Sequence, residues 1–188
     1  MQMIKKWGSC IVPFIAGVLA LALSACSGMV AVSTIMGQST TNVTKAFKVL
    51  TEKELLTQAK EAGLTSEFMT MKVFSIVLTV LAVLLIIYSI IMLLKNVNVI
   101  KSDSKVFSIV GLSLISLFLI ASIGVLVSSN IYAGAMAEHA NNLFEQLHMS
   151  AIASASVKIG VYQPIMLATG IVSALAVIFC EIKNIITK

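Results

Sequence analysis

The stretch LALSACSGMVAVSTIMG, residues 21–37, decides how many times this chain crosses a membrane, because it fits two different structures. Its residues Leu23-Ser24-Ala25-Cys26 match a bacterial lipobox, at which a signal peptidase cuts and the cysteine receives a lipid. The apolar run nevertheless continues for eleven residues beyond Cys26, as it would inside a transmembrane helix. The first structure leaves three membrane spans in the mature chain, and the second leaves four.

The composition predicts an integral membrane protein. Hydrophobic residues make up 59% of the 188 residues and charged residues only 11%, whereas soluble domains carry roughly 25% charged residues. The net charge is +5, and all thirteen basic residues are lysines. Because arginine is absent, the chain lacks the planar fork that binds bases and phosphates in bidentate fashion. We therefore expect the lysines to orient the chain in a membrane and not to bind nucleic acid.

Four stretches are long and apolar enough to cross a hydrocarbon core of roughly 30 Å, which takes about 20 residues. They cover about residues 10–33, 73–94, 106–129 and 159–180. The fourth stretch contains Pro164 near its beginning, where a helix tolerates proline. We expect a single membrane domain over residues 1–188. Its fold class would be all-α, an antiparallel four-helix transmembrane bundle, or three spans if residues 1–25 are cleaved.

The distribution of lysine predicts the orientation of these spans. With the N-terminus inside, the inner segments carry seven lysines and two acidic residues, whereas the outer segments carry six of each. The inner loop, about residues 95–105, is short, so its positive charge is dense. By the positive-inside rule both termini of the uncleaved chain are cytoplasmic. The longer segments, about 38–72 and 130–158, then face outward from a bacterial cytoplasmic membrane.

Short amphipathic helices are predicted in both outer segments. In the first, Thr51 and Glu54 have the spacing of a capping box. Gly63 followed by Leu64 suits a left-handed stop at the end of that helix. In the second, one apolar stripe recurs at intervals of three and four residues: Met136, Ala140, Leu143 and Leu147. Such faces pack on one another, on the membrane surface or on a partner.

The fate of residues 1–25 stays open between two readings. Lys5 and Lys6, the apolar segment after them and the small residues at the cut site favour cleavage and lipidation of Cys26. Cleavage, however, would leave an apolar segment that is too short to span. A stripe of small residues also crosses the cut site, as in closely packed transmembrane helices: Ala16, Ala20, Ser24 and Gly28. We favour the retained helix and keep lipidated Cys26 as the alternative.

The other spans carry comparable stripes of small residues, which predict contact between helices. In the second span they are Ser75, Thr79 and Ala82. In the third they are Ala121, Gly124 and Ser128, and in the fourth Gly170, Ser173 and Ala174. We expect these stripes to pack within one bundle, with self-association or other membrane-protein subunits as further partners.

Asp, Glu, Lys, Arg and His are absent from residues 73–94, 106–129 and 159–180, so we do not expect a proton relay in the membrane. The segment AEHANNLFEQLHM, residues 137–149, holds a weak metal candidate. Glu145 and His148 have the E-x-x-H spacing of ferritin-like helices, and Glu138 lies one heptad earlier. A di-metal site needs a second such motif, and the chain has only two histidines. We expect a solvated polar face here, with no metal and no cofactor.

The sequence favours a non-enzymatic accessory or structural subunit of a bacterial membrane assembly, in contact with membrane lipids and protein subunits. One alternative is a homo-oligomeric pore lined by hydroxyls, from Ser75, Thr79 and Ser89 or from Ser113 and Ser116. A lipid-anchored lipoprotein is another. An enzyme that uses the outer carboxylates and histidine ranks last, because no nucleophile elbow, P-loop or nucleotide-binding glycine motif is present.

Overall fold

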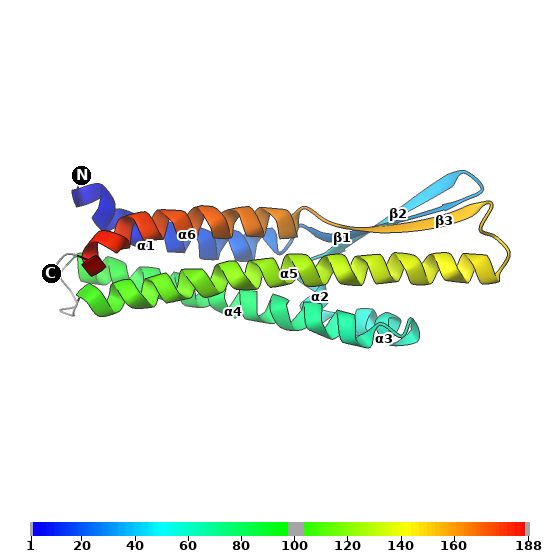
Figure 1. Ribbon diagram of the computed structural model, residues 1–188, viewed down its shortest axis with the longest axis horizontal. Coiled ribbons are helices and arrows are strands. Elements are labelled where there is room, and N and C mark those ends of the chain that lie inside the picture. Colours follow the sequence, from blue (N-terminus) through cyan, green and yellow to red (C-terminus); the bar gives the residue numbers. More distant parts are fainter. Residues whose placement is uncertain (1, 98–103, 187–188) are drawn as a thin grey trace. The chain divides into compact units, whose positions relative to one another are not determined.

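The computed structural model describes residues 2–97 and 104–186, without the side chains of residues 2–6, 9, 104 and 181–186. The elements follow in the order α1, β1, β2, α2, α3, α4, α5, β3 and α6 (Figure 1). They form two compact units. The helical unit comprises Met1–Ala22, Val77–Ile123 and Met166–Lys188, and the sheet unit comprises Leu23–Ile76 and Gly124–Ile165.

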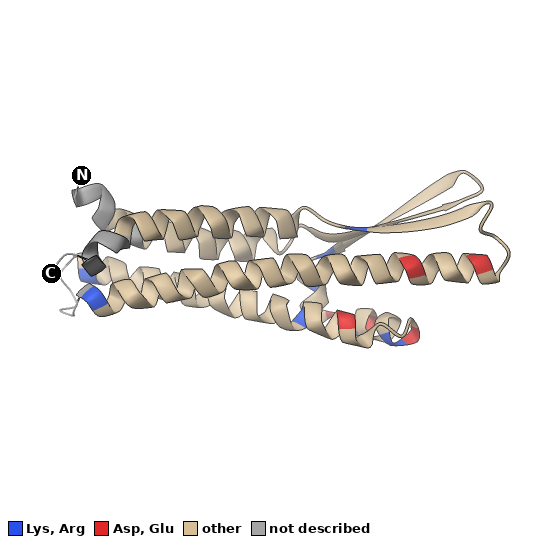
Figure 2. Cartoon of the chain, in the orientation of Figure 1, with Lys and Arg blue, Asp and Glu red and all other residues tan. Residues whose placement is uncertain are grey.

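Among the described residues, three helices are long and apolar enough to cross a membrane. They are α4 (Thr65–Asn96), most of α5 (Ser104–Gln146) and the Tyr162–Cys180 portion of α6 (Tyr162–Ile186). Figure 2 shows the middle of each of these helices without a charged residue. The second, third and fourth predicted spans are thus confirmed as long apolar helices. In α1 (Gln2–Leu23), the apolar portion Cys10–Leu23 is shorter.

The first predicted span is wrong beyond residue 23, because the chain leaves the helix there. Residues Ser27–Ile35 form the strand β1. Their alternation of β-branched residues with small ones suits a pleated strand, and a strand can share its backbone hydrogen bonds with a neighbour on each side. The expectation of an all-α fold is corrected by the same observation. Ser24 and Gly28 lie outside α1, so the predicted helical stripe ends at Ala20.

β1 is the centre of an antiparallel sheet with the order β2-β1-β3. β2 (Gln38–Lys45) follows β1 through a two-residue turn, and β3 is Ala153–Ile159. Both turn residues have a positive φ, 50° at Met36 and 79° at Gly37. Positive φ at both positions is the mark of a type I′ turn, whose twist matches that of the paired strands.

The sheet unit has a small apolar core. Met29 of β1 is buried there with Phe68 and Met71 of α4 and with Tyr132 of α5. The rings of Phe68 and Tyr132 meet edge to face, with centroids 5.5 Å apart. Two short helices, α2 (Lys48–Thr51) and α3 (Lys53–Glu61), close this core through Val49 and Ala59.

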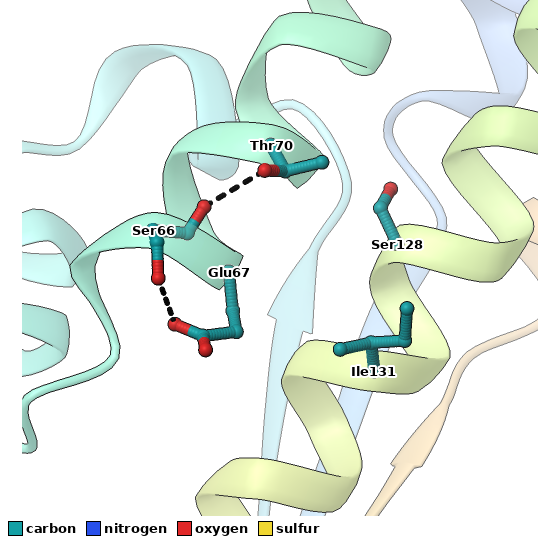
Figure 3. Close-up of a pocket in the computed structure, with 5 residues that line it drawn as sticks. All are labelled: Ser66, Glu67, Thr70, Ser128 and Ile131. Atoms are coloured by element: carbon teal, nitrogen blue, oxygen red, sulfur yellow. Dashed lines mark hydrogen bonds between the residues drawn. The ribbon is translucent and has the colours of Figure 1, made fainter.

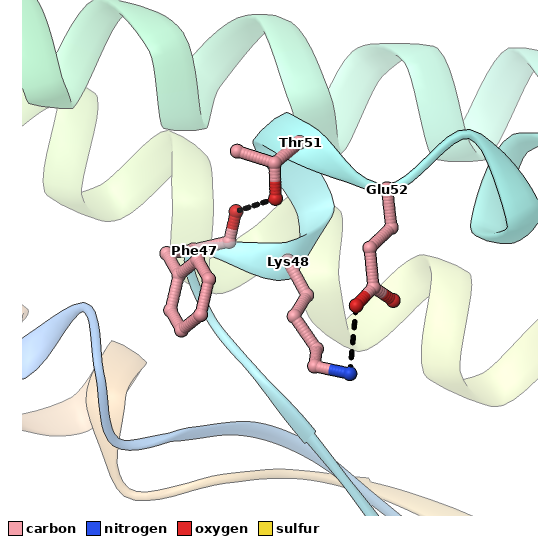
Figure 4. A network of polar contacts seen from close by, with 4 residues as sticks. All are labelled: Phe47, Lys48, Thr51 and Glu52. Carbon is pink, nitrogen blue, oxygen red and sulfur yellow. Dashed lines mark hydrogen bonds and ion pairs between the residues drawn. The ribbon is translucent and has the colours of Figure 1, made fainter.

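The predicted capping box is wrong, because Thr51 belongs to α2 and does not cap α3. Its hydroxyl donates to the carbonyl of Phe47 at 3.3 Å (Figure 4). Glu52 is the residue before α3, and its carboxylate pairs with Lys48 at 2.7 Å. The predicted stop at the other end of α3 is confirmed. Gly63 has a φ of 70° and donates to Lys60, while Leu64 donates to Ala59.

α5 does not end near residue 129, where the third predicted span ends, and residues 130–146 continue the same helix instead of forming a separate short one. Its 43 residues correspond to about 64 Å at 1.5 Å per residue. The continuation is rich in alanine, the strongest helix former, and holds no proline. Of the predicted apolar stripe, Met136 packs on the core, whereas Leu143 and Leu147 are exposed.

Small residues permit close contacts inside the helical unit. A Cβ on Gly17 of α1 would lie 2.6 Å from the carbonyl oxygen of Ala82 on α4, and a Cβ on Gly170 of α6 would lie 3.2 Å from Leu119 of α5. The predicted packing residues divide into two groups by exposure. Buried are Ala16, Ala20, Gly28, Ala82, Ala121, Ser128, Gly170, Ser173 and Ala174, and partly exposed are Ser24, Ser75, Thr79 and Gly124.

We predict that Gly17→Ala destabilises the protein, because the new methyl group would press on the Ala82 carbonyl and on Ile86 at 2.7 Å. Overpacking of this kind costs about 1–3 kcal/mol, which thermal unfolding followed by circular dichroism in detergent would detect. The matched control is Gly134→Ala in α5, where nothing lies within 4 Å of the added Cβ. That control should be neutral or stabilising by about 0.5–1 kcal/mol, and equal effects at the two sites would contradict the packing argument.

Candidate functional site

The metal candidate of the sequence is not assembled by the fold. α5 ends two residues before His148, which has a left-handed φ of 57°. The His148 amide donates to the Glu145 carbonyl at 2.9 Å and the Met149 amide to the Phe144 carbonyl at 2.8 Å, the pattern of a Schellman stop. Glu145 and His148 therefore do not share a helix face, and the predicted E-x-x-H pair is wrong. Both are exposed, as is Glu138, and no cluster of three potential metal ligands occurs within the described residues.

Cys26 lies in the turn that joins α1 to β1, so the lipobox falls at a boundary between two elements. Its amide donates to the Leu23 carbonyl at 2.8 Å, and its carbonyl accepts from the Ala46 amide at 3.0 Å. The residues after Cys26 are paired on both sides as β1, so cleavage would not strand a loose apolar segment. α1 itself is held in the helical unit, where the buried Cys10 thiol accepts from the Asn96 amide at 2.8 Å.

Three of the five hydroxyls predicted to line a pore donate to their own helices. Ser75 donates to Met71 at 2.8 Å, Ser89 to Leu85 at 2.6 Å and Ser116 to Leu112 at 2.8 Å. Ser113 is exposed and Thr79 is partly exposed. A hydroxyl bonded in this way keeps its acceptor lone pairs but has no donor to offer to a passing ion or solute.

A shallow pocket of about 200 Å³ lies between α4 and α5 in the sheet unit. Figure 3 shows its lining, formed by Ser66, Glu67, Thr70, Ser128 and Ile131. The Ser66 hydroxyl donates to the Glu67 carboxylate at 2.7 Å, and the Thr70 hydroxyl donates to the Ser66 carbonyl at 2.9 Å. The hydroxyls of Ser66 and Thr70 thus have hydrogen-bond partners within α4. The pocket offers a single carboxylate and no pair of groups arranged for general acid–base catalysis.

A buried amide joins the start of α6 to the sheet. Gln163 is 3% exposed, and its Nε2 donates to the Gly28 carbonyl at 2.7 Å and to the Ser129 hydroxyl at 3.3 Å. The Gly28 carbonyl also accepts from the Gly160 amide at 2.8 Å. A Cβ at Gly160 would collide with the backbone of Ser27, so only glycine allows β1 and the end of β3 to approach this closely.

The free side of β3 is covered at its centre by one side chain. Asn141 of α5 donates its Nδ2 to the Ala155 carbonyl at 3.0 Å and accepts from the Ala155 amide at 2.8 Å. The side-chain amide of Asn141 thus supplies the hydrogen-bond donor and acceptor that the backbone of a neighbouring strand would supply. Helices and loops that cover a sheet edge in this way prevent it from pairing with another chain.

The free side of β2 has no such cover. Both backbone groups of Ala155 bond Asn141 and so point away from β1. The N–H and C=O of Ser33, which lies opposite Ala155, therefore point toward β2, where they exchange hydrogen bonds with Thr40. The alternate residues Ser39, Thr41 and Val43 therefore direct their N–H and C=O groups outward from the sheet. All three are exposed, and within the described part of the chain nothing bonds to these outward groups.

The β1–β2 hairpin is cross-linked by hydroxyl pairs near its turn and is apolar at its tip. Hydroxyl pairs cross it, from Ser33 to Thr40 at 2.8 Å and from Thr34 to Ser39 at 3.0 Å. At the tip, Met36 is 74% exposed, and its amide donates to the carbonyl of Ile152, before β3, at 2.7 Å. The edge of β2 together with this tip forms the candidate interaction site, which we call the β2 edge (residues 36–45).

Comparison with known proteins leaves the site to be interpreted from its own geometry, since no family model, curated protein or solved structure matches the chain. Sequence reasoning missed the β2 edge and the Asn141 contact. A signal for the hairpin was present. Met36-Gly37 separates a β-branched run from the Ser- and Thr-rich segment QSTTNVTK, residues 38–45, which is the pattern of two strands around a short turn.

We predict that Asn141→Ala exposes the Ala155 amide to solvent exchange. A net hydrogen-bond contribution of about 1 kcal/mol corresponds to roughly fivefold faster exchange, which hydrogen–deuterium exchange would resolve at Ala155. Asn142→Ala is the matched control, because Asn142 is also exposed on α5 but does not bond Ala155. Unchanged exchange at Ala155 in the first variant would refute the role of Asn141 as an edge cover.

We predict an intact mass for the purified protein that corresponds to the full chain of 20.0 kDa, because α1 is packed within the helical unit. The measurement is mass spectrometry of protein from gentle detergent, with Cys26→Ser as the control that cannot be lipidated. A mass for a chain that begins at a diacylated Cys26, lost in the control, would establish the lipoprotein alternative with three spans.

Proposed function

We propose that this protein is a non-enzymatic structural or accessory subunit of a membrane assembly and acts by contact. The observation that carries the proposal is the β2 edge, an uncovered strand with an apolar tip at Met36. Uncovered edges are templates for pairing, and proteins that do not use them usually blunt them. A chain that covers the β3 side and leaves the β2 side free presents one surface for association.

The helical unit supports a place for this subunit in the membrane. Its helices expose large apolar side chains, among them Val80 of α4, Ile120 of α5 and Phe179 of α6. In a lipid bilayer such side chains contact acyl chains or neighbouring helices. We infer an antiparallel four-helix transmembrane bundle in a bacterial cytoplasmic membrane, with both termini inside, and the excess of lysine in the predicted inner segments supports this orientation.

Contact partners of three kinds fit this protein: membrane lipids, other membrane-protein subunits and further copies of the chain. The small-residue contacts around Gly17 and Gly170 already join helices within the unit. Partner subunits would therefore meet the remaining apolar helix faces and the β2 edge. The hydroxyl-lined pore is less well supported, because the Ser75, Ser89 and Ser116 hydroxyls already donate to their own helices.

We predict that cross-linking in native membranes, followed by gentle-detergent purification, returns complexes larger than the monomer. Met36→Asn should reduce their yield severalfold, because it removes the exposed apolar tip. Asparagine is favoured in type I′ turns, so the hairpin itself should remain folded, which far-ultraviolet circular dichroism would check. Monomer alone in native membranes would contradict the proposed function. Solute flux through reconstituted vesicles would instead identify the protein as a pore.

A further inference from the structure

We propose that the free edge of β2 pairs with β2 of a second copy of this chain, antiparallel, with Thr41 opposite Thr41. Two three-stranded sheets would thereby become one sheet of six strands. This inference rests on the proposed contact function and names its partner. The occupant is a second copy because the β2 edge is complementary to itself in backbone pattern, in charge and in the apolar groups at its two ends.

The backbone pattern comes from the register. Ser39, Thr41 and Val43 direct their N–H and C=O groups away from β1. In an antiparallel pair centred on Thr41, Ser39 lies opposite Val43 and Thr41 lies opposite itself. Every outward group of one copy then meets an outward group of the other, as a two-fold axis requires.

Over residues 38–44, β2 lacks the usual protections against pairing. Natural edges are blunted by charges, proline or bulges, but residues 38–44 contain no charge and no proline. The register shift between β1 and β2 lies at the far end, at Ser27 and Met29. By contrast, Asn141 covers the opposite edge of the sheet at Ala155. The chain therefore blocks one edge and keeps the other straight and neutral.

Charge decides the direction of the pairing. Lys45 is the only charged residue of β2. In a parallel, in-register pair the two Lys45 side chains would lie side by side, and like charges opposite one another are destabilising. The antiparallel pair centred on Thr41 separates them by the length of the strand and sets each Lys45 near the partner's Gly37 turn, which carries no charge.

Apolar groups complete the match at both ends. Continued past the strand, the same register brings the hairpin tip of one copy toward the far end of β2 in the other. The tip residue Met36 is 74% exposed, and Phe47, which follows β2 at the start of α2, is 38% exposed (Figure 4). Contacts between a methionine and an aromatic ring contribute about 0.3–1.5 kcal/mol each, and the two-fold axis forms this contact twice.

Cysteine substitution in the full-length, detergent-solubilised protein tests the register. Residues exchanging hydrogen bonds across an antiparallel pair have Cα atoms about 5.5 Å apart, within the roughly 4.4–6.8 Å of a disulfide. Thr41→Cys should give a covalent dimer on mild oxidation. Ser39→Cys and Val43→Cys should each give no covalent dimer on its own, and a mixture of the two should give a disulfide-linked heterodimer. The unsubstituted chain controls for its own three cysteines, and a Ser39→Cys homodimer would overturn the antiparallel register.

Proline variants test the hydrogen bonds without a cross-link. Thr41→Pro removes an N–H that points away from β1, so the hairpin should persist while dimer dissociation becomes at least tenfold more favourable. Thr40→Pro is the matched control. Its N–H bonds to β1, and its loss should disturb the hairpin itself. Circular dichroism and sedimentation of both variants separate the two effects, and an unchanged dimer in Thr41→Pro would overturn the proposal.

Failure of this inference is distinguishable from failure of the proposed function. If Thr41→Cys gives no dimer while the chain still purifies with other membrane proteins, the pairing is wrong and the contact function stands. If the chain is monomeric in every preparation, including native membranes, both are wrong.

Discussion

The two-sided pairing of β1 is the constraint on which the rest of the sheet unit depends. A backbone N–H or C=O without a partner is costly wherever water is scarce, and residues 27–35 are too apolar to remain a loop. A helix would satisfy these groups within the segment, whereas a strand needs neighbours. β2 comes directly after β1 through the Met36-Gly37 turn, and β3 arrives from more than a hundred residues away. The sheet is therefore complete only when β3, which follows α5 in the chain, pairs with the free side of β1.

Close backbone contacts at Gly28 and Gly160 stabilise the pairing of β3 with β1. A Cβ at Gly160 would collide with the backbone of Ser27, and a Cβ at Gly28 would press on Ala46. Gln163 adds an amide that donates to the Gly28 carbonyl. The oxygen of that amide, Oε1, has no hydrogen-bond partner among the described residues. A buried acceptor without a partner costs about 1–3 kcal/mol, whereas the Nε2 of the same amide donates to Gly28 and joins the start of α6 to β1.

The long helices were predicted from the sequence, whereas the sheet was missed although its hairpin left a signal at Met36-Gly37. Twenty uncharged apolar residues specify a helix that could span a membrane, because no other open structure satisfies its backbone there. That argument found α4, α5 and α6 but misread residues 27–35, since a short apolar run fits a helix end or a buried strand equally well. The Gly63 stop was visible because it is local. The Asn141 contact joins residues fourteen positions apart in the sequence, and a periodic pattern of apolar residues does not indicate such a contact. Glu145 and His148 do not share a helix face because α5 ends before His148.

The amide of Asn141 has a consequence for how large an assembly can become. A sheet with two open edges can add chains indefinitely at either side and grows as a fibre. A sheet with one edge occupied from within can add only one neighbour, and the process ends there as a closed pair. In the proposed dimer, a single side chain on α5 limits the sheet to two copies, and a chain without it would have two open edges.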